Sequence, residues 1–326
     1  MGGVFFMFSA LDRTAVLLSG CLLMAALWSI VRVPDANFLM IVFTCLGAAL
    51  LGDEPSFRKR VVKTLIWALY GGTVQFLISL SVGEAFFQLL IPTAAGWFTF
   101  RTLPDSRAAC IVMLTGFLAT FAPPGFDAAA GRCADIFAGA LIILAVTAFD
   151  SSRERKTPLP QRAGSSPRQA LLIAAELGTG GVVSLLLQLS QGAWIMLTIL
   201  FINMNKTPRD SGTKLALQRI FSVPLGIILG GLLLSTFYRI DQRFIWLLPF
   251  IGATAFYVLY SRGDFFIFSM IFMMTVTLFT DLMSGTYQRF DFWESFFSRS
   301  VATLIGALIE LCFSYRGRYE KRSASL

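Results

Sequence analysis

Long runs of apolar residues, each bounded by charged residues, proline or glycine, recur along the chain. A run of roughly 20 such residues is what an α-helix needs to cross a bilayer. In the first half the runs predict spanning helices at 14–31, 36–52, 61–80, 85–100, 108–122 and 133–149. In the second half they predict helices at 168–189, 191–204, 219–238, 244–260, 265–283 and 300–314. The expected fold is therefore all-α, a polytopic transmembrane bundle of about 12 helices.

The composition leaves little room for a soluble domain. Apolar residues make up 56% of the 326 residues and charged residues only 14%, with a mean hydropathy of +0.71. The absence of histidine removes the commonest general base and metal ligand. The sequence lacks a phosphate-binding GxxxxGK[ST] motif, and its five cysteines form no CxxC pair. We expect no enzyme, no cofactor and no metal site.

Basic residues are distributed unevenly between the predicted loops. With both termini in the cytoplasm, 21 of the 27 Lys and Arg residues fall at the cytoplasmic ends of the helices and six at the opposite side. This bias is the one that orients membrane proteins, so it explains the net charge of +8 without nucleic acid. A role for the basic stretch 153–168 in binding anionic lipids stays open.

The two halves resemble each other. The third helix of each half has an Arg followed at the same distance by a Gly pair (60 and 71–72, 219 and 230–231), and the sixth helices share Arg-x6-Gly-Ala-Leu-Ile. Six helices is an even number, so the copies predict parallel repeats, with a substrate path between them. The expected organisation is a repeat at 11–150, a Ser- and Pro-rich cytoplasmic linker at 151–167, a repeat at 168–315 and a basic cytoplasmic tail at 316–326.

The segment WIMLTILFINMNKTPRDSGTKLALQRIFSVPLGIILGG combines a Thr-bearing apolar run, a polar turn, an Arg and a Gly-rich helix. It resembles the fusaric acid resistance and aromatic acid exporter superfamily, in a compact, membrane-only form. A weaker copy in the first half has Lys63 and Trp67 where that family more often shows Gly or Thr. The resemblance spans roughly 11–315. It implies efflux of aromatic or amphipathic organic acids across a bacterial inner membrane, often with a periplasmic adaptor (membrane-fusion) protein as partner.

Glu176 is the sharpest candidate for chemistry. It lies about nine residues into a predicted helix, beside small residues, and charged groups at that depth are costly. A carboxyl group kept from water can hold a proton, so Glu176 is the expected proton-coupling residue. A protonated acid that only pairs with a neighbouring helix is the alternative. Glu310 is expected to form a salt bridge with a loop arginine, and Thr198 to bond its own helix backbone.

Four arginines are candidate contacts for an anionic substrate. Arg60 and Arg219 occupy matching positions at the cytoplasmic start of the third helix of each half, where a guanidinium suits a carboxylate. Arg132 and Arg299 lie at the start of the sixth helices, on the side where positive charge is rare. The alternatives are snorkelling at the interface for the first pair and structural pairing for the second, Arg132 with Asp135.

These observations favour a proton-driven secondary transporter, an antiporter that exports small organic anions through the bilayer. A non-transporting membrane scaffold of an envelope assembly complex and a gated anion channel are the alternatives. An adaptor protein and a homo-oligomer stay open.

Overall fold

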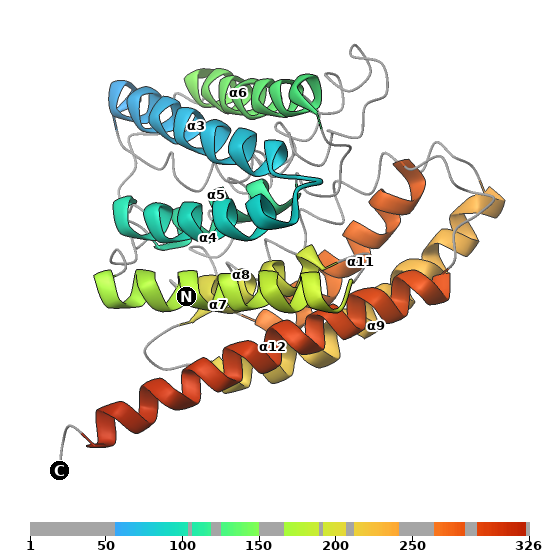
Figure 1. Ribbon diagram of the computed structural model, residues 1–326. Coiled ribbons are helices and arrows are strands. Elements are labelled where there is room, and N and C mark those ends of the chain that lie inside the picture. The colour runs from blue at the N-terminus through green and yellow to red at the C-terminus, as the bar shows by residue number, and fades with distance from the viewer. Residues whose placement is uncertain are drawn as a thin grey trace, which may run out of the picture. The chain divides into compact units, whose positions relative to one another are not determined.

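The computed structural model describes residues 56–103, 106–118, 125–149, 166–188, 192–206, 212–240, 264–283 and 292–323 (Figure 1). All regular elements in this part of the chain are α-helices, as the hydropathy pattern predicted. They are α3 (Phe57–Leu80), α4 (Ala85–Thr102), α5 (Ser106–Leu118), α6 (Phe126–Phe149), α7 (Pro167–Leu186), α8 (Ala193–Asn205), α9 (Gly212–Ile240), α11 (Phe265–Met283) and α12 (Phe292–Ser323). The helices predicted at 14–31, 36–52 and 244–260 lie outside the described residues, so the total of 12 stays a prediction.

Three helices extend well beyond their predicted limits. Helices α6 and α9 each begin seven residues before the predicted 133 and 219, and α12 begins eight residues before 300 and ends nine after 314. The prediction stopped each helix at a charged residue because it placed that charge in water. The structure instead buries Arg132, Arg219 and Arg299 inside these three helices, so the apolar runs are shorter than the helices themselves.

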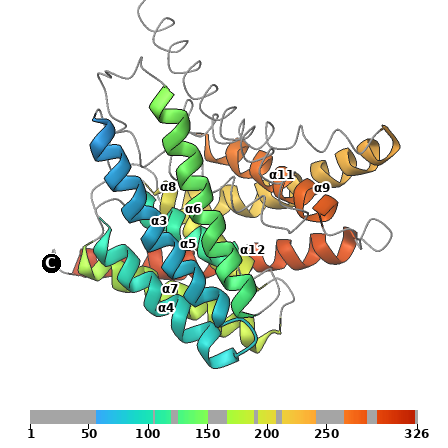
Figure 2. The same ribbon diagram turned by 90° about the horizontal axis from the view of Figure 1, so that it is seen from above.

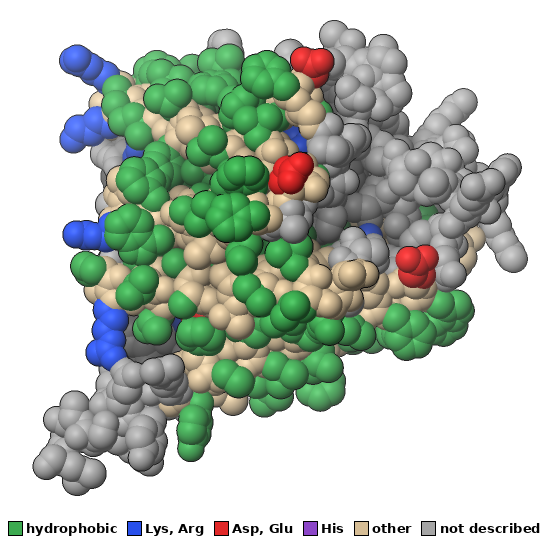
Figure 3. Space-filling model, viewed as in Figure 1, with side chains coloured by type: hydrophobic (Ala, Val, Ile, Leu, Met, Phe, Trp, Pro, Cys, Tyr) green, Lys and Arg blue, Asp and Glu red, His purple; other side chains and the backbone are tan. Residues whose placement is uncertain are grey.

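The chain is a multi-pass membrane protein. Four helical stretches are long and apolar enough to cross a bilayer: Phe57–Leu80, Pro167–Leu186, Gly212–Thr236 and Phe296–Tyr315. Large apolar side chains on their outer faces, such as Leu69, Leu186 and Leu232, are more than half exposed. Figure 3 shows hydrophobic side chains over much of one face. Exposed apolar surface of this extent is stable when lipid covers it.

The chain divides into two compact units that cut across the order of the sequence. Unit 2 consists of residues 74–129, 162–225 and 291–326. In it α4 lies alongside α7, and the short helix α8 packs against α5, α7 and α12 (Figures 1 and 2). Glycines allow these close approaches, because a Cβ at Gly306 of α12 would lie 2.6 Å from the Ile195 carbonyl oxygen of α8.

Unit 1 consists of residues 1–73, 130–161 and 226–290. In it α3 packs on α6, where a Cβ at Gly72 would lie 3.0 Å from the Cys133 sulfur. Helix α9 packs on α11 even more closely, since a Cβ at Gly226 would lie 2.4 Å from the Met270 carbonyl oxygen. Small residues thus set the helix contacts of unit 1 as they do in unit 2.

Candidate functional site

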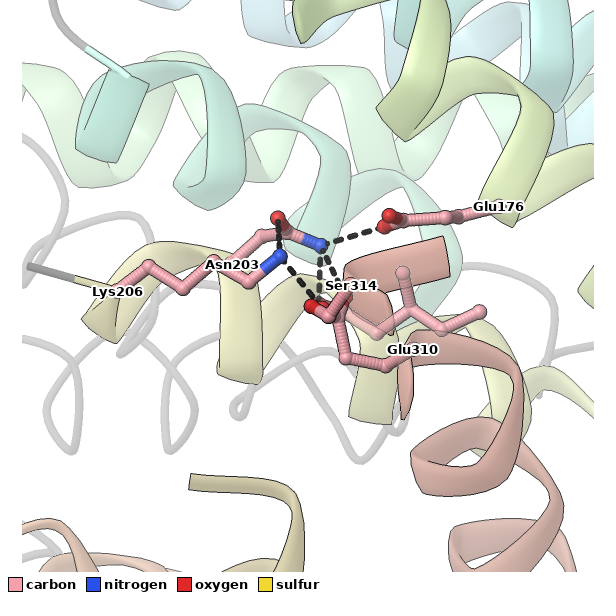
Figure 4. A network of polar contacts seen from close by, with 6 residues as sticks. Glu176, Asn203, Lys206, Glu310 and Ser314 are labelled. Carbon is pink, nitrogen blue, oxygen red and sulfur yellow. Dashed lines mark hydrogen bonds and ion pairs between the residues drawn. The ribbon is translucent and has the colours of Figure 1, made fainter. Parts of the chain in front are cut away.

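The candidate site is a polar cluster at one end of α8. Ten of the 13 residues of this helix are buried. Its sequence AWIMLTILFINMN is apolar almost throughout, so burial on all sides suits it. Its polar residues are Thr198, Asn203 and Asn205, and Lys206 directly follows it. Asn203 and Lys206 belong to the cluster. They meet Glu176 from α7 and Glu310 and Ser314 from α12 (Figure 4).

Asn203 joins the two carboxyl groups. Its Nδ2 donates hydrogen bonds to Glu176 Oε2 at 2.8 Å and to Glu310 Oε2 at 3.1 Å, and it also contacts the Ile199 carbonyl oxygen at 3.0 Å. The two carboxyl oxygens can therefore be no more than 5.9 Å apart. Asn203 Oδ1 accepts a hydrogen bond from Lys206 Nζ at 3.0 Å. One amide thus links both acids to the only cation of the cluster.

Glu310 has a donor on each of its oxygens. Its Oε1 accepts from Ser314 Oγ at 2.6 Å and lies 2.5 Å from Lys206 Nζ, while Oε2 accepts from Asn203. The predicted salt bridge of Glu310 is therefore confirmed in kind, but its partner is Lys206 and not an arginine. Sequence reasoning expected an arginine because most loop cations are arginines.

The charges of the cluster do not cancel. Glu176 is 3% exposed and Glu310 fully buried, whereas the Lys206 side chain is 28% exposed. Two buried carboxyl groups therefore share one partly exposed ammonium group. The cluster is electrically neutral when the two acids together hold one proton, and buried charge is costly unless it is balanced.

Gly212, the first residue of α9, closes the cluster on another side. A Cβ there would lie 2.7 Å from Ser314 Oγ and 3.1 Å from both Glu310 Oε1 and Lys206 Cε. Only hydrogen fits in this space without moving the side chains of the cluster. Four helices, α7, α8, α9 and α12, thus converge on the two acids.

The cluster lies away from the ends of α7 and α12, although it lies at the start of α9. Glu176 is nine residues from the start of α7 and Ser314 is nine residues from the end of α12. Nine residues of α-helix span roughly 13 Å. Helix α8, by contrast, ends at Asn205, directly beside the cluster. The acids are therefore recessed relative to α7 and α12 and lie next to the end of α8.

Two of the predicted arginines lie over aromatic rings of α8. The Arg219 guanidinium carbon is 4.5 Å from the centre of the Phe201 ring, and that of Arg299 is 5.5 Å from the centre of the Trp194 ring. Both arginines are buried, at 0% and 5% exposure. Arg299 was expected at the start of its helix, but it lies seven residues inside α12. Cation–π contact offsets part of the cost of such burial.

The other two arginines belong to unit 1. Arg60 lies in the first turn of α3, over the Phe57 ring of its own helix, and is 6% exposed. Arg132 lies six residues inside α6 and is 2% exposed, so the expectation that it begins the helix is wrong as well. Asp135, also buried, acts electrostatically on Arg132. The predicted pairs, 60 with 219 and 132 with 299, are thus each divided between the two units.

Sequence reasoning found Glu176 but missed most of its partners. Asn203 and Gly212 carry no charge, and Lys206 looked like an ordinary loop cation. The available signal was spacing, because Arg299, Thr303, Gly306, Glu310 and Ser314 follow one another at intervals of three or four residues. Such residues share one face of a helix.

Thr198 overturns an expectation too. Its hydroxyl does not bond its own helix; it is buried and has no hydrogen-bond partner in the described part of the structure.

Comparison with known proteins finds a family match within the second half of the chain. Residues 179–313 match the family model described as fusaric acid resistance protein-like. The matched segment contains Asn203, Lys206, Gly212, Arg219 and Glu310, and it begins three residues after Glu176. No curated protein and no solved structure matches the chain.

Proposed function

We propose that this chain, whose residues 179–313 match the fusaric acid resistance protein-like family model, is a proton-coupled efflux transporter for small anionic aromatic or amphipathic organic acids. The observation that carries the proposal is the buried cluster in which Glu176 and Glu310 share Asn203 and a single lysine. A resistance family and a multi-pass helical fold both suit export. The setting we propose is a bacterial inner membrane, with both termini in the cytoplasm.

The acid pair is the proposed proton carrier. A proton bound by Glu176 and Glu310 together neutralises the charge that Lys206 leaves unbalanced, and its loss restores that charge. Asn203 bonds to both acids, so a change at one is felt at the other. Proton binding therefore alters the contacts among α7, α8 and α12 at once, which is what coupling to a conformational change requires.

Arg219 is the proposed anion contact in unit 2. It lies seven residues after Gly212, so the two residues share one side of α9, two turns apart. Its guanidinium has a geometry that suits a carboxylate, and the Phe201 ring beside it suits an aromatic group. Arg299 beside Trp194 is a second contact of the same chemistry, and Arg60 and Arg132 are the proposed contacts of unit 1.

The test is transport by the purified full-length protein in proteoliposomes. Flux of labelled benzoate, 2-naphthoate and related arylcarboxylates is measured with an imposed pH gradient, for wild type and Glu176→Gln. We expect saturable flux that depends on the gradient and falls at least about tenfold in the variant, because the amide cannot carry a proton.

Glu294→Gln is the matched control, since Glu294 is exposed in the first turn of α12 and takes no part in the cluster. It should transport like wild type. Gradient-driven flux that survives Glu176→Gln would refute the proposed role of Glu176 but leave the transporter. Failure of every arylcarboxylate to move would refute the proposed function.

A further inference from the structure

We propose that one face of α3 binds the carboxylate of the aromatic substrate, with Thr64 and Trp67 donating hydrogen bonds beside Arg60. The inference rests on the proposed function and adds two residues and a specific surface to it. All three residues belong to unit 1, so the surface is defined within that unit alone.

The three side chains share one face of the helix. Positions 60, 64 and 67 are four and three residues apart, which places them within about 60° of one another around the axis. Their side chains are 6%, 1% and 3% exposed. The face therefore presents a guanidinium, a hydroxyl and an indole N–H over two successive turns, out of contact with bulk water.

The hydroxyl of Thr64 is free to donate. Thr73, on the same helix, donates to the Leu69 carbonyl oxygen four residues back at 2.8 Å. The same bond is made by Thr93, Thr179, Thr236 and Thr275. Thr64, like the buried Thr99, Thr198 and Thr303, has a hydroxyl with no hydrogen-bond partner in the described part of the structure. Its donor is thus available to a ligand.

Trp67 places a second available donor one turn further along. The indole Nε1 is buried and has no partner among the described residues. An indole N–H donates and cannot accept, and buried polar groups are nearly always bonded. Two neighbouring donors without acceptors fit a ligand that brings acceptors only. A carboxylate does so.

The contact with α6 is centred to one side of this face. Helix α6 contacts α3 at Gly72, which lies about 120° around the axis from Arg60, about 80° from Thr64 and about 140° from Trp67. The charge of α3 suits an anion as well, because its sequence contains Arg58, Lys59, Arg60 and Lys63 and no acid. The packing of α3 on α6 and the charge of α3 are both compatible with an anionic ligand on this face.

The second half of the chain does not repeat these donors. The positions of α9 that correspond to Thr64 and Trp67, at the spacing that aligns Arg60 with Arg219, are Val223 and Gly226. Gly226 instead packs against the Met270 backbone of α11. The proposed carboxylate surface is thus a property of the first copy, whereas the buried acids belong to the second.

The test measures binding of labelled benzoate to the full-length protein in detergent, with benzamide as the uncharged competitor. Thr64→Val keeps the shape of the side chain and removes its donor, and Trp67→Phe keeps an aromatic ring of smaller size and removes the indole N–H. Thr73→Val and Trp97→Phe are the matched controls, because Thr73 already bonds its own helix and Trp97 is 44% exposed on α4. Circular dichroism and thermal unfolding verify that each variant folds.

We expect each α3 donor variant to weaken benzoate binding by about tenfold, since hydrogen bonds to a carboxylate are charge-assisted. The controls should stay within about twofold of wild type, and benzamide should compete poorly. The inference is overturned if the Thr64→Val and Trp67→Phe proteins fold and bind benzoate as wild type does. In that case, gradient-driven flux in wild type would still support the proposed function. A wild-type protein that neither binds nor moves any arylcarboxylate would overturn both.

Discussion

Helices α6 and α12 share a sequence signature but make different polar contacts. Each has an arginine followed seven residues later by Gly-Ala-Leu-Ile, and each buries that arginine. The next residue is Ile143 in α6 and Glu310 in α12. The position three residues after the arginine is Asp135 in α6, which acts on Arg132, and Ala302 in α12. Arg299 lies instead over Trp194 of α8.

The difference shows how two helices with the same sequence signature can make different contacts. Both helices have the buried arginine and the glycine, and in α12 the glycine permits close packing on α8. In α12 a carboxyl group comes one turn after the glycine, and α8 supplies Asn203 and Lys206 to meet it. The two helices thus share a sequence signature, and Glu310 makes α12 part of the polar cluster.

The largest loss of stability and flux should come from Glu310→Ile, which gives α12 the residue that α6 has at the corresponding position, Ile143. It removes the acceptor of Asn203, Lys206 and Ser314, and leaves Glu176 with the amide alone. We expect a loss of about 3 kcal/mol in unfolding free energy and no gradient-driven flux. Lys206 can turn to water, which keeps the loss below that of a fully buried pair. Unfolding in mixed micelles and proteoliposome flux measure the two effects.

Glu310→Gln separates the two effects. The amide keeps the acceptor oxygen for one of the donors but cannot hold a proton, so folding should largely recover while flux stays lost. Recovery of flux in Glu310→Gln would show that Glu310 only holds the helices together.

A smaller effect should follow from Gly306→Ala in the shared signature. The added Cβ would meet the Ile195 carbonyl oxygen at 2.6 Å and the Thr198 Cβ at 3.0 Å, so α8 and α12 must separate. We expect a net loss of about 2 kcal/mol, even though alanine favours the helix. Gly181→Ala is the control, because its Cβ meets only the tip of Leu89 at 3.0 Å. Equal losses in the two variants would contradict the tight α8–α12 contact.

The smallest of the three effects should come from Ser314→Ala. It removes one donor to Glu310 Oε1 and leaves the contacts with Lys206 and Asn203. We expect a loss of about 1 kcal/mol and a modest reduction in flux. Ser235→Ala, at an exposed hydroxyl that bonds the Leu232 carbonyl oxygen, should change stability by less than about 0.5 kcal/mol. A larger effect at Ser235 than at Ser314 would show that the hydrogen bond to Glu310 contributes nothing.

Much of the fold was predictable because lipid imposes a simple rule. Backbone groups in a membrane must be satisfied within a helix, so apolar runs locate the helices, and all nine described ones were found. The limits failed at Arg132, Arg219 and Arg299. There the prediction placed the charge in water, whereas the structure buries it, two of the three beside an aromatic ring.

The candidate site was only partly predictable. Glu176 is visible because a charge in an apolar run is rare and costly. Asn203 and Glu310 lie 27 and 134 residues away from it along the chain, and only the packing of three helices brings them to it. A single sequence does not predict contacts between residues so far apart in the chain. The regular spacing of polar residues on α12 does indicate which face of that helix carries the cluster.

The recessed position of the acid pair has an electrical consequence. The acids lie roughly 7–13 Å from the ends of their candidate spans, which is about a third of a bilayer's hydrocarbon thickness. A proton that moves between the nearer surface and the pair therefore crosses about a third of the membrane voltage. At about 2.3 kcal/mol per charge for each 100 mV, that step is worth about 0.8 kcal/mol. Occupancy of the pair should accordingly respond to voltage even when the pH is equal on both sides.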